Sequence, residues 1–355
     1  MEISTPGRVC LFGEHQDYLG LPVLAMAISL RSKISGDYRS DSLVIINKPD
    51  IGEIEKFNLN NIDYESSRDY LKSGLNICKR LGFRFSRGFE CEIQSNIPIK
   101  AGTSSSSSIL VSWIHFLSQI ADNPRTLDKN KIAEIAYEAE VIEFNSPGGM
   151  MDQYSTALGG LIYLESNPKV VVEQLTKDLG AFVLGDSMEQ KDTIGILSRC
   201  KEDRLAIIKK MREFNSDINF HTISLDQIES YNLNEDEQKL IQGTIKNREL
   251  LLRAFEEINK SEFDEKLFGG LLNEHHFVLR DVLKVSTPKI ELMLKHALEA
   301  GAYGGKINGS GGGGCMFAYC PKNPEEVKEA IEKAGGKAYI IYSSGGTEIN
   351  LKGKK

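Results

Sequence analysis

The sequence predicts an α+β protein built from two domains. Its 355 residues amount to more than two domains of roughly 150 residues each. Strands and amphipathic helices alternate in the first half, and the chain ends in a helix, strand, helix, strand order that suits a split βαβ or ferredoxin-like sandwich. The pattern changes near residue 170, where long charged helical stretches begin. We therefore expect domains at 1–170 and 171–355.

In the first half, apolar runs at 9–12 and 21–28 predict two strands on either side of a polar turn. Apolar and charged residues alternate at 89–93, which is typical of a half-buried strand. Apolar side chains at helical spacing predict helices over 109–120 and 132–139.

The second half is richer in helices. The predicted elements are short strands at 170–172 and 181–184, helices at 191–214, 235–259 and 289–300, a strand at 315–319, a helix that starts near residue 324 and a strand at 338–342. This order places a βαβ unit at the end of the chain.

Composition excludes several classes of protein. There are 43 Lys and Arg residues against 50 Asp and Glu, a net charge of −7, so the chain lacks the basic field of a nucleic-acid binder. No run reaches the roughly 18 apolar residues of a membrane span, and the first residues do not resemble a secretion signal. We expect a cytoplasmic protein that acts without a membrane, as a monomer or weak homodimer. The six scattered cysteines are expected to be reduced and mostly buried.

A serine-rich block lies between a predicted strand and a predicted helix. Gly102, Thr103, Ser104, Ser105 and Ser106 are small residues whose backbone N–H groups can turn toward an anion at a helix N-terminus. Their hydroxyls can also bind phosphate oxygens or Mg²⁺. A flexible linker is the alternative, but a linker is not expected between a strand and an amphipathic helix. The block lacks the Gly-Lys-Ser/Thr ending of a Walker A loop.

A run of glycines at 309–314, broken only by Ser310, precedes the strand at 315–319. Glycine permits left-handed backbone and close approach to a ligand. A crowded loop at the start of a strand is an equally good interpretation of this run.

Two further polar segments are candidates for chemistry. Asp152 follows a Pro-Gly-Gly turn, where it is either a turn residue or a carboxylate that orients a hydroxyl for phosphoryl transfer. The turn at 14–18, with Arg8 upstream, places donors and acceptors between apolar runs, which suits a ligand rich in hydroxyls or an exposed turn. His15 has no second metal ligand at a suitable spacing.

Four ordered segments resemble the motifs of the GHMP small-molecule kinases, and among them those of the galactokinases. They are PGRVCLFGEHQDYLG, PIKAGTSSSSS, GGMMDQYSTALGG and KINGSGGGGCMFAY, supported by HHFVLRD at 275–281 with Val285 and Ser286 after it. The likeness spans nearly the whole chain. It implies an N-terminal domain like domain 2 of ribosomal protein S5, a ferredoxin-like C-terminal domain and a site between them.

The resemblance also implies roles for individual residues. Asp152 falls on the catalytic aspartate and Arg8 on the basic residue beside the transferred phosphoryl group. Glu14, His15 and Asp17 fall on sugar contacts, residues 102–106 with Gly311 and Gly312 on the ATP phosphate site, and Ser106 with Glu140 on the Mg²⁺ ligands. The implied activity is transfer of the γ-phosphoryl group of ATP to a monosaccharide, at the anomeric hydroxyl of galactose or a related sugar.

The sequence departs from the galactokinase pattern at three places. Thr103 and Ser107 replace a leucine and an alanine, which are small changes. The segment from Gly185 through Asp186 and Ser187 lacks the galactokinase tyrosine and paired arginines. Two alternatives are open: another GHMP kinase, such as a mevalonate-type kinase, and a non-catalytic sugar sensor. Against them, the turn at 14–18 has the sugar-kinase form, and the serine block is uninterrupted.

Overall fold

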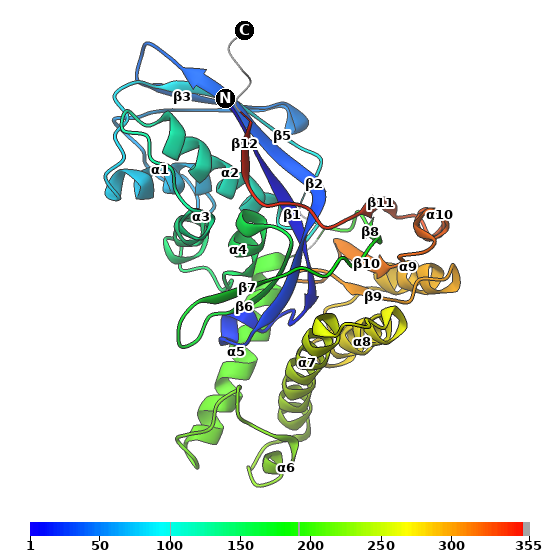
Figure 1. The fold of residues 1–355 in the computed structure, drawn as a ribbon. Coiled ribbons are helices and arrows are strands. Elements are labelled where there is room, and N and C mark those ends of the chain that lie inside the picture. The colour runs from blue at the N-terminus through cyan, green and yellow to red at the C-terminus, as the bar shows by residue number, and fades with distance from the viewer. Residues whose placement is uncertain (100, 191, 351–355) are drawn as a thin grey trace.

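The computed structural model describes residues 1–99, 101–190 and 192–350. Its larger sheet has eight strands, six of which run in the order β12-β1-β2-β5-β3-β4, while β6 pairs with both β2 and β7 (Figure 1). The strands are β1 (Glu2–Phe12), β2 (Val23–Tyr38), β3 (Leu43–Lys48), β4 (Glu53–Asn58), β5 (Phe89–Ser95), β6 (Leu161–Glu165), β7 (Val171–Leu175) and β12 (Glu348–Asn350).

Helices cover one face of this sheet (Figure 1). They are α1 (Tyr70–Arg80), α2 (Ser105–Ile120), α3 (Lys129–Tyr137) and α4 (Met151–Leu158), and α3 continues into a π-helical turn at Glu138–Ile142. Short 3-10 turns lie at Asp17–Leu19 and Pro49–Ile51. The buried face of α2 carries Trp113 and Phe116, which pack with Phe89 of β5. This packing holds the second half of α2 against an interior strand of the sheet.

The smaller sheet has the order β11-β8-β10-β9, with all neighbouring strands antiparallel. Its strands are β8 (Phe182–Asp186), β9 (Gly304–Ile307), β10 (Cys315–Tyr319) and β11 (Lys337–Ile341), and α9 (Pro288–Glu299) and α10 (Pro324–Lys333) pack on it. In chain order this is a 4-1-3-2 arrangement with helices before the second and fourth strands, which is the ferredoxin-like sandwich predicted from the sequence.

Between β8 and α9 the chain forms a helical arm that extends away from both sheets (Figure 1). It consists of α5 (Thr193–Arg212), α6 (Leu225–Ile228) and α7 (Glu235–Asn259). The chain then returns through α8 (Glu265–Phe277), which packs on β9 and is followed by a π-helical turn at Val278–Val282. The far part of the arm is held by a core of its own, which includes Met211, Phe220 and Ile241.

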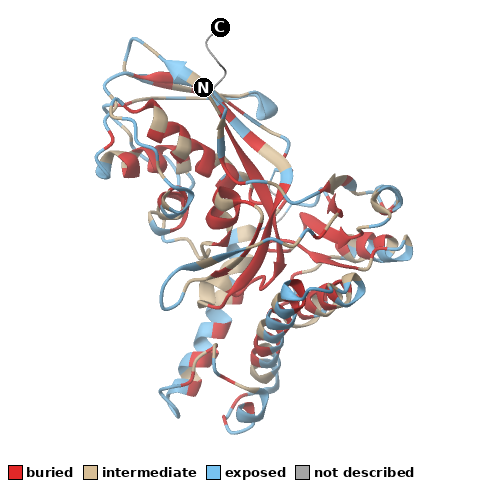
Figure 2. Ribbon diagram, viewed as in Figure 1, coloured by how far each residue is buried: buried red, intermediate tan, exposed pale blue. Residues whose placement is uncertain are grey.

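A single hydrophobic cluster joins the two sheets. It contains Val9 of β1, Leu24 of β2, Leu184 of β8, Phe317 of β10 and Leu272 of α8, all almost fully buried. Figure 2 accordingly shows the centre of the molecule as buried, while the end of the arm is largely exposed. Burial of this cluster, at ~25 cal/mol per Å² of apolar surface removed from water, helps to hold the two sheets together.

The fold agrees with the predicted α+β class, and several strands and helices match their expected bounds. The first two strands are longer than predicted, because β1 and β2 continue through polar and small residues that the apolar runs omit. The division at residue 170 stays a prediction; β7, just beyond it, and β12 both pair within the larger sheet.

Two expectations from composition can be compared with the structure. All six cysteines are buried, as predicted. Within the described ranges, no helix is long and apolar enough to cross a membrane.

Candidate active site

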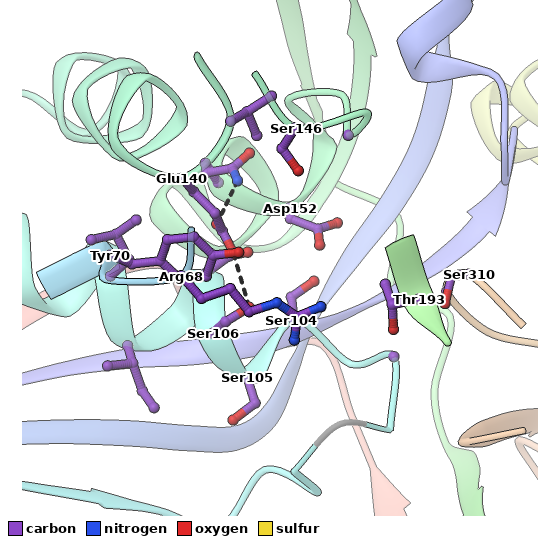
Figure 3. A pocket seen from close by; sticks show the side chains of 18 of the residues that line it. Arg68, Tyr70, Ser104, Ser105, Ser106, Glu140, Ser146, Asp152, Thr193 and Ser310 are labelled. Atoms are coloured by element: carbon purple, nitrogen blue, oxygen red, sulfur yellow. Dashed lines mark hydrogen bonds between the residues drawn. The ribbon is translucent and has the colours of Figure 1, made fainter. Parts of the chain in front are cut away.

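A cavity of about 610 Å³ opens where the two sheets meet. Its walls come from β1, the polar turn at 14–18, the start of α2, the π-helical turn before α4, α4 itself, the first turn of α5 and residues 309–310. In Figure 3, Ser106 and Glu140 lie between Arg68 and Tyr70 on one side and Thr193 and Ser310 on the other. The cavity therefore collects residues from almost the whole length of the chain.

Residues 102–106, here called the serine loop, wrap around the N-terminus of α2. Gly102 has φ of 88° and Ser104 has φ of 57°, so the backbone turns twice through left-handed conformations before the helix begins. Such a turn directs successive N–H groups inward, and the first N–H groups of a helix lack intrahelical partners. The serine loop thus has the backbone geometry expected of an anion site.

Arg8 of β1 is held against Asp152 in the first turn of α4. Its Nε and Nη2 donate to Asp152 Oδ1 at 2.9 and 2.7 Å. Burial alone would lower the pKa of the Arg8 guanidinium, but the charges of Asp152 and Glu14 raise it above its usual value. The guanidinium therefore stays charged beside a carboxylate that is partly open to the cavity, with 31% of its side chain exposed.

Glu140 and Ser106 form the second polar pair of the site. Ser106 Oγ donates to Glu140 Oε1 at 2.9 Å, and Gln153 Nε2 donates to Glu140 Oε2 at 2.6 Å. Burial raises the pKa of the Glu140 carboxyl, and no cationic side chain among the described residues pairs with it. Glu140 lies in the π-helical turn, a distortion that is frequent at functional sites.

Hard oxygen ligands beside an anion site suit Mg²⁺, which commonly uses one or two carboxylates together with substrate phosphates. Ser106 and Glu140 fit this role. Within residues 1–99, 101–190 and 192–350 no group of three or more His, Cys, Asp and Glu could hold an ion by itself. The remaining ligands would have to come from phosphate and water.

In the polar turn, Glu14 and His15 are held by protein partners. Lys306 of β9 donates to Glu14 Oε2 at 2.8 Å and to the carbonyl of Cys10 at 2.8 Å, in a pair that is almost completely buried. The His15 ring bonds Tyr18 through Nδ1 and the Ser310 carbonyl through Nε2. Both residues line the cavity, but their orientation depends on these partners.

Asp17 is the residue of the polar turn whose pKa is raised by the charge of Asp152. Burial and the negative charge of Asp152 raise the pKa of Asp17 to about 6, partly offset by backbone N–H groups that include that of Tyr18. A Cβ at position 149 would collide with Asp17 Oδ2, so only glycine fits there. This close approach explains the second glycine of the Pro-Gly-Gly turn before α4.

The raised pKa predicts how Asp17 affects stability. An unfolded aspartate has a pKa of about 4, so between pH 4 and 6 the folded state binds the extra proton. The stabilisation is complete below pH 4 and is lost as the pH rises through about 6. Urea unfolding of Asp17→Asn should show it gaining stability relative to the unmodified protein from pH 5 to pH 7.5. Exposed Asp203→Asn is the matched control, and equal differences at both pH values for Asp17→Asn would contradict the raised pKa.

The cavity brings together most of the residues predicted from the sequence. Those that line it are Arg8, Glu14, His15, Asp17, Gly102, Ser104, Ser105, Ser106, Glu140 and Asp152. Thr103, Gly311 and Gly312 are not among the lining residues. The Thr103 side chain is fully buried beneath the loop, whereas Gly311 and Gly312 pack against Val285.

Three family models match the chain. They are "GHMP kinases N terminal domain" at residues 69–160, "GHMP kinases C terminal" at 251–339 and "Galactokinase galactose-binding signature" at 2–35. Together they cover more than half of the chain, in the order of the motifs recognised above. The chain belongs to the GHMP kinases. Members of this family are ATP-dependent phosphotransferases that act on alcohols.

Relatives of this GHMP kinase include mevalonate kinases and galactokinases. A mevalonate kinase of Thermococcus gammatolerans is 28% identical over 99% of this chain and 96% of its own, and a galactokinase of Pyrococcus furiosus is 25% identical over 98% and 99%. Among solved structures, Lactococcus lactis galactokinase complexed with galactose aligns with a TM-score of 0.85 at 21% identity, over 98% of this chain and 94% of its own. Methanococcus jannaschii mevalonate kinase aligns with a TM-score of 0.75 at 21% identity, over 97% and 98%. The structural likeness shows the two-domain fold.

Several lining residues of this GHMP kinase were not identified from the sequence. Arg68 lies just before α1, Tyr70 is the first residue of α1, and neither belongs to a recognisable pattern; Thr193 begins α5. Lys306 does not line the cavity but anchors Glu14. A lysine in an otherwise apolar strand just before the glycine run was a usable signal for a buried partner.

Proposed function

We propose that this GHMP kinase phosphorylates a neutral monosaccharide, galactose or a related sugar, at its anomeric hydroxyl. The observation that carries the proposal is the charge of the acceptor side of the cavity. Glu14, Asp17 and Asp152 are all acidic there. Carboxylates accept hydrogen bonds from sugar hydroxyls, so this wall suits a polyol.

The two cations that contact the carboxylates of this wall are already engaged. Arg8 is bonded to Asp152 and Lys306 to Glu14, at 2.7 and 2.8 Å. An acceptor with its own carboxylate would need a free cation and would be repelled by the acidic wall. A sugar has neither disadvantage, and the match of residues 2–35 to the galactose-binding signature supports the same choice.

In the proposed mechanism, Asp152 accepts a hydrogen bond from the acceptor hydroxyl and takes its proton as the phosphoryl group moves. Arg8 holds the Asp152 carboxylate in place and offsets negative charge that accumulates near the transferred group. The N–H groups of the serine loop bind the phosphates of ATP. Because phosphoryl transfer depends mainly on positioning and charge stabilisation, these roles account for most of the catalysis.

Ser106 and Glu140 are proposed to hold the Mg²⁺ that accompanies ATP. When bound, the ion neutralises phosphate charge. Ser106→Ala combined with Glu140→Ala should abolish the Mg²⁺-dependent part of ATP binding in titration calorimetry while leaving a weaker Mg²⁺-independent part. Ser146→Ala, another hydroxyl that lines the cavity, is the matched control. Unchanged ATP affinity with Mg²⁺ in the double variant would contradict the assignment.

A panel of acceptors tests the proposed function. ADP release is measured with ATP, Mg²⁺ and each of galactose, glucose, mannose and mevalonate. We expect release with at least galactose, and Asp17→Ala should raise the KM for the sugar more than the KM for ATP. Release with mevalonate alone would overturn the sugar-kinase proposal, and release with no compound would favour a sugar sensor.

A mevalonate-type kinase is the second candidate. The specific observation in its favour is that the mevalonate kinase of Thermococcus gammatolerans matches this chain at 28% identity, slightly above the 25% of the Pyrococcus furiosus galactokinase. The panel includes mevalonate for this reason. Cytoplasmic localisation and a monomeric or weakly dimeric state remain predictions from the sequence.

A further inference from the structure

A chain of buried polar groups runs behind the acceptor wall of the cavity. Arg204 of α5 donates through Nη2 to the Tyr18 hydroxyl at 2.6 Å. The Tyr18 hydroxyl lies 2.9 Å from His15 Nδ1, and His15 Nε2 lies 3.0 Å from the backbone carbonyl of Ser310. Four residues, up to about three hundred positions apart in the sequence, are thus connected by consecutive hydrogen bonds.

The chemistry of the two end groups determines where each proton lies. A guanidinium only donates, so the Tyr18 oxygen is the acceptor at one end and its own proton points to His15 Nδ1. A carbonyl only accepts, so His15 must carry its proton on Nε2. Burial and the charge of Arg204 lower the pKa of His15 to about 3, and burial raises the pKa of Tyr18. His15 is therefore a neutral ring in a single tautomer.

Arg204 is costly to bury. It is 0% exposed, and among the described residues no carboxylate lies within ion-pair distance of it. Its acceptors are the Tyr18 hydroxyl and the Cys200 carbonyl one helical turn away, at 2.6 Å. A buried guanidinium without a counter-ion is unfavourable relative to an apolar side chain of similar size. Its presence at this position indicates a role other than stability.

This chain of hydrogen-bonded groups links three elements that each supply a wall of the cavity. The first turn of α5 supplies Thr193, the polar turn supplies His15, and the glycine run supplies Ser310. Gly309 approaches the serine loop so closely that a Cβ there would lie 2.7 Å from the carbonyl oxygen of Gly102. A displacement of the His15 ring would therefore move the acceptor wall relative to the phosphate site.

We propose that Arg204 and Tyr18 are positioning residues that hold His15 as the Nε2–H tautomer and thereby fix the acceptor wall against the glycine run. The inference rests on the proposed kinase function for its kinetic consequence, but its structural part stands without any acceptor. In this arrangement both nitrogens of the His15 ring are bonded to protein groups, Nδ1 to Tyr18 and Nε2 to the Ser310 carbonyl.

The first experiment needs no substrate. A proton–nitrogen correlation spectrum of protein with isotope-labelled histidine, assigned with His15→Gln, should show His15 neutral with its proton on Nε2 at pH 7. Tyr18→Phe and Arg204→Met should both move the Nδ1 resonance, because the hydrogen bond to Nδ1 is lost or weakened. The control is Tyr319→Phe, which removes a buried hydroxyl that has no partner. A proton on Nδ1, or an unmoved resonance in Arg204→Met, would overturn the proposal.

The second experiment measures kinetics with galactose as acceptor, or with mevalonate if only mevalonate releases ADP in the panel. Arg204→Met and Tyr18→Phe should each raise the acceptor KM about tenfold, as expected when a reacting group is misplaced. The double variant should be no worse than either single one, and Arg204→Lys should recover part of the loss. Titration with Mg²⁺ and ADP should give affinities within about twofold of the unmodified protein, because the serine loop is not part of this hydrogen-bonded chain of side chains. Equal losses of acceptor and ADP affinity, or additive effects in the double variant, would show a merely structural role and overturn the proposal.

Discussion

Asp152→Asn should lower kcat by roughly 10²- to 10⁴-fold, the range typical of a lost general base. The amide keeps the size of the carboxylate and its oxygen can still accept from Arg8, so the 2.7 Å contact does not require rearrangement. It cannot take the proton of the acceptor hydroxyl. Because that loss acts in the transition state, the KM values for ATP and sugar should change far less than kcat. Steady-state ADP release measures all three constants.

Folding must be intact for this result to be informative. Asp152→Asn should melt within a few degrees of the unmodified protein by circular dichroism. Exposed Asp50→Asn, which removes another carboxylate from the lining of the same cavity, is the matched control and should retain near-normal kcat. Near-normal turnover in a folded Asp152→Asn protein would make Asp152 a turn residue and disprove the mechanism.

Lys306→Met should destabilise the protein by about 3–5 kcal/mol, because it leaves the Glu14 carboxylate buried without its cation. The two side chains are 0% and 3% exposed, so water cannot replace the lost partner. The variant also removes the donor to the Cys10 carbonyl. Urea unfolding gives the difference in unfolding free energy.

Two variants make this result specific. Lys333→Met breaks an ion pair whose side chains are 74% and 68% exposed, and should change the unfolding free energy by less than about 1 kcal/mol. Adding Glu14→Gln to Lys306→Met should recover part of the lost stability, since the unpaired charge is then removed. If Lys306→Met were as harmless as Lys333→Met, the buried pair would not hold the polar turn.

Local patterns in the sequence were sufficient for much of the fold. The glycine and proline signals bounded elements such as β10, and helical spacing of apolar residues located α2 and α7. They failed where structure depends on distant partners. The π-helical turn that presents Glu140 has no local signature, because it forms where α3 meets the packing of α1 and α4.

Local chemistry in the sequence specified the serine loop, the polar turn and the aspartate after the Pro-Gly-Gly turn, because each is a short segment whose residue types limit what its backbone can do. Tertiary structure alone decided which of them act together. The bond from Arg8 to Asp152 joins residues 144 positions apart, and the pair of Lys306 with Glu14 joins residues 292 apart. Such contacts form only when the two sheets close on their shared core, which brings the donors and acceptors out of water and toward one another. Pairing of this kind depends on the path of the whole chain, which residue types and local spacing do not encode.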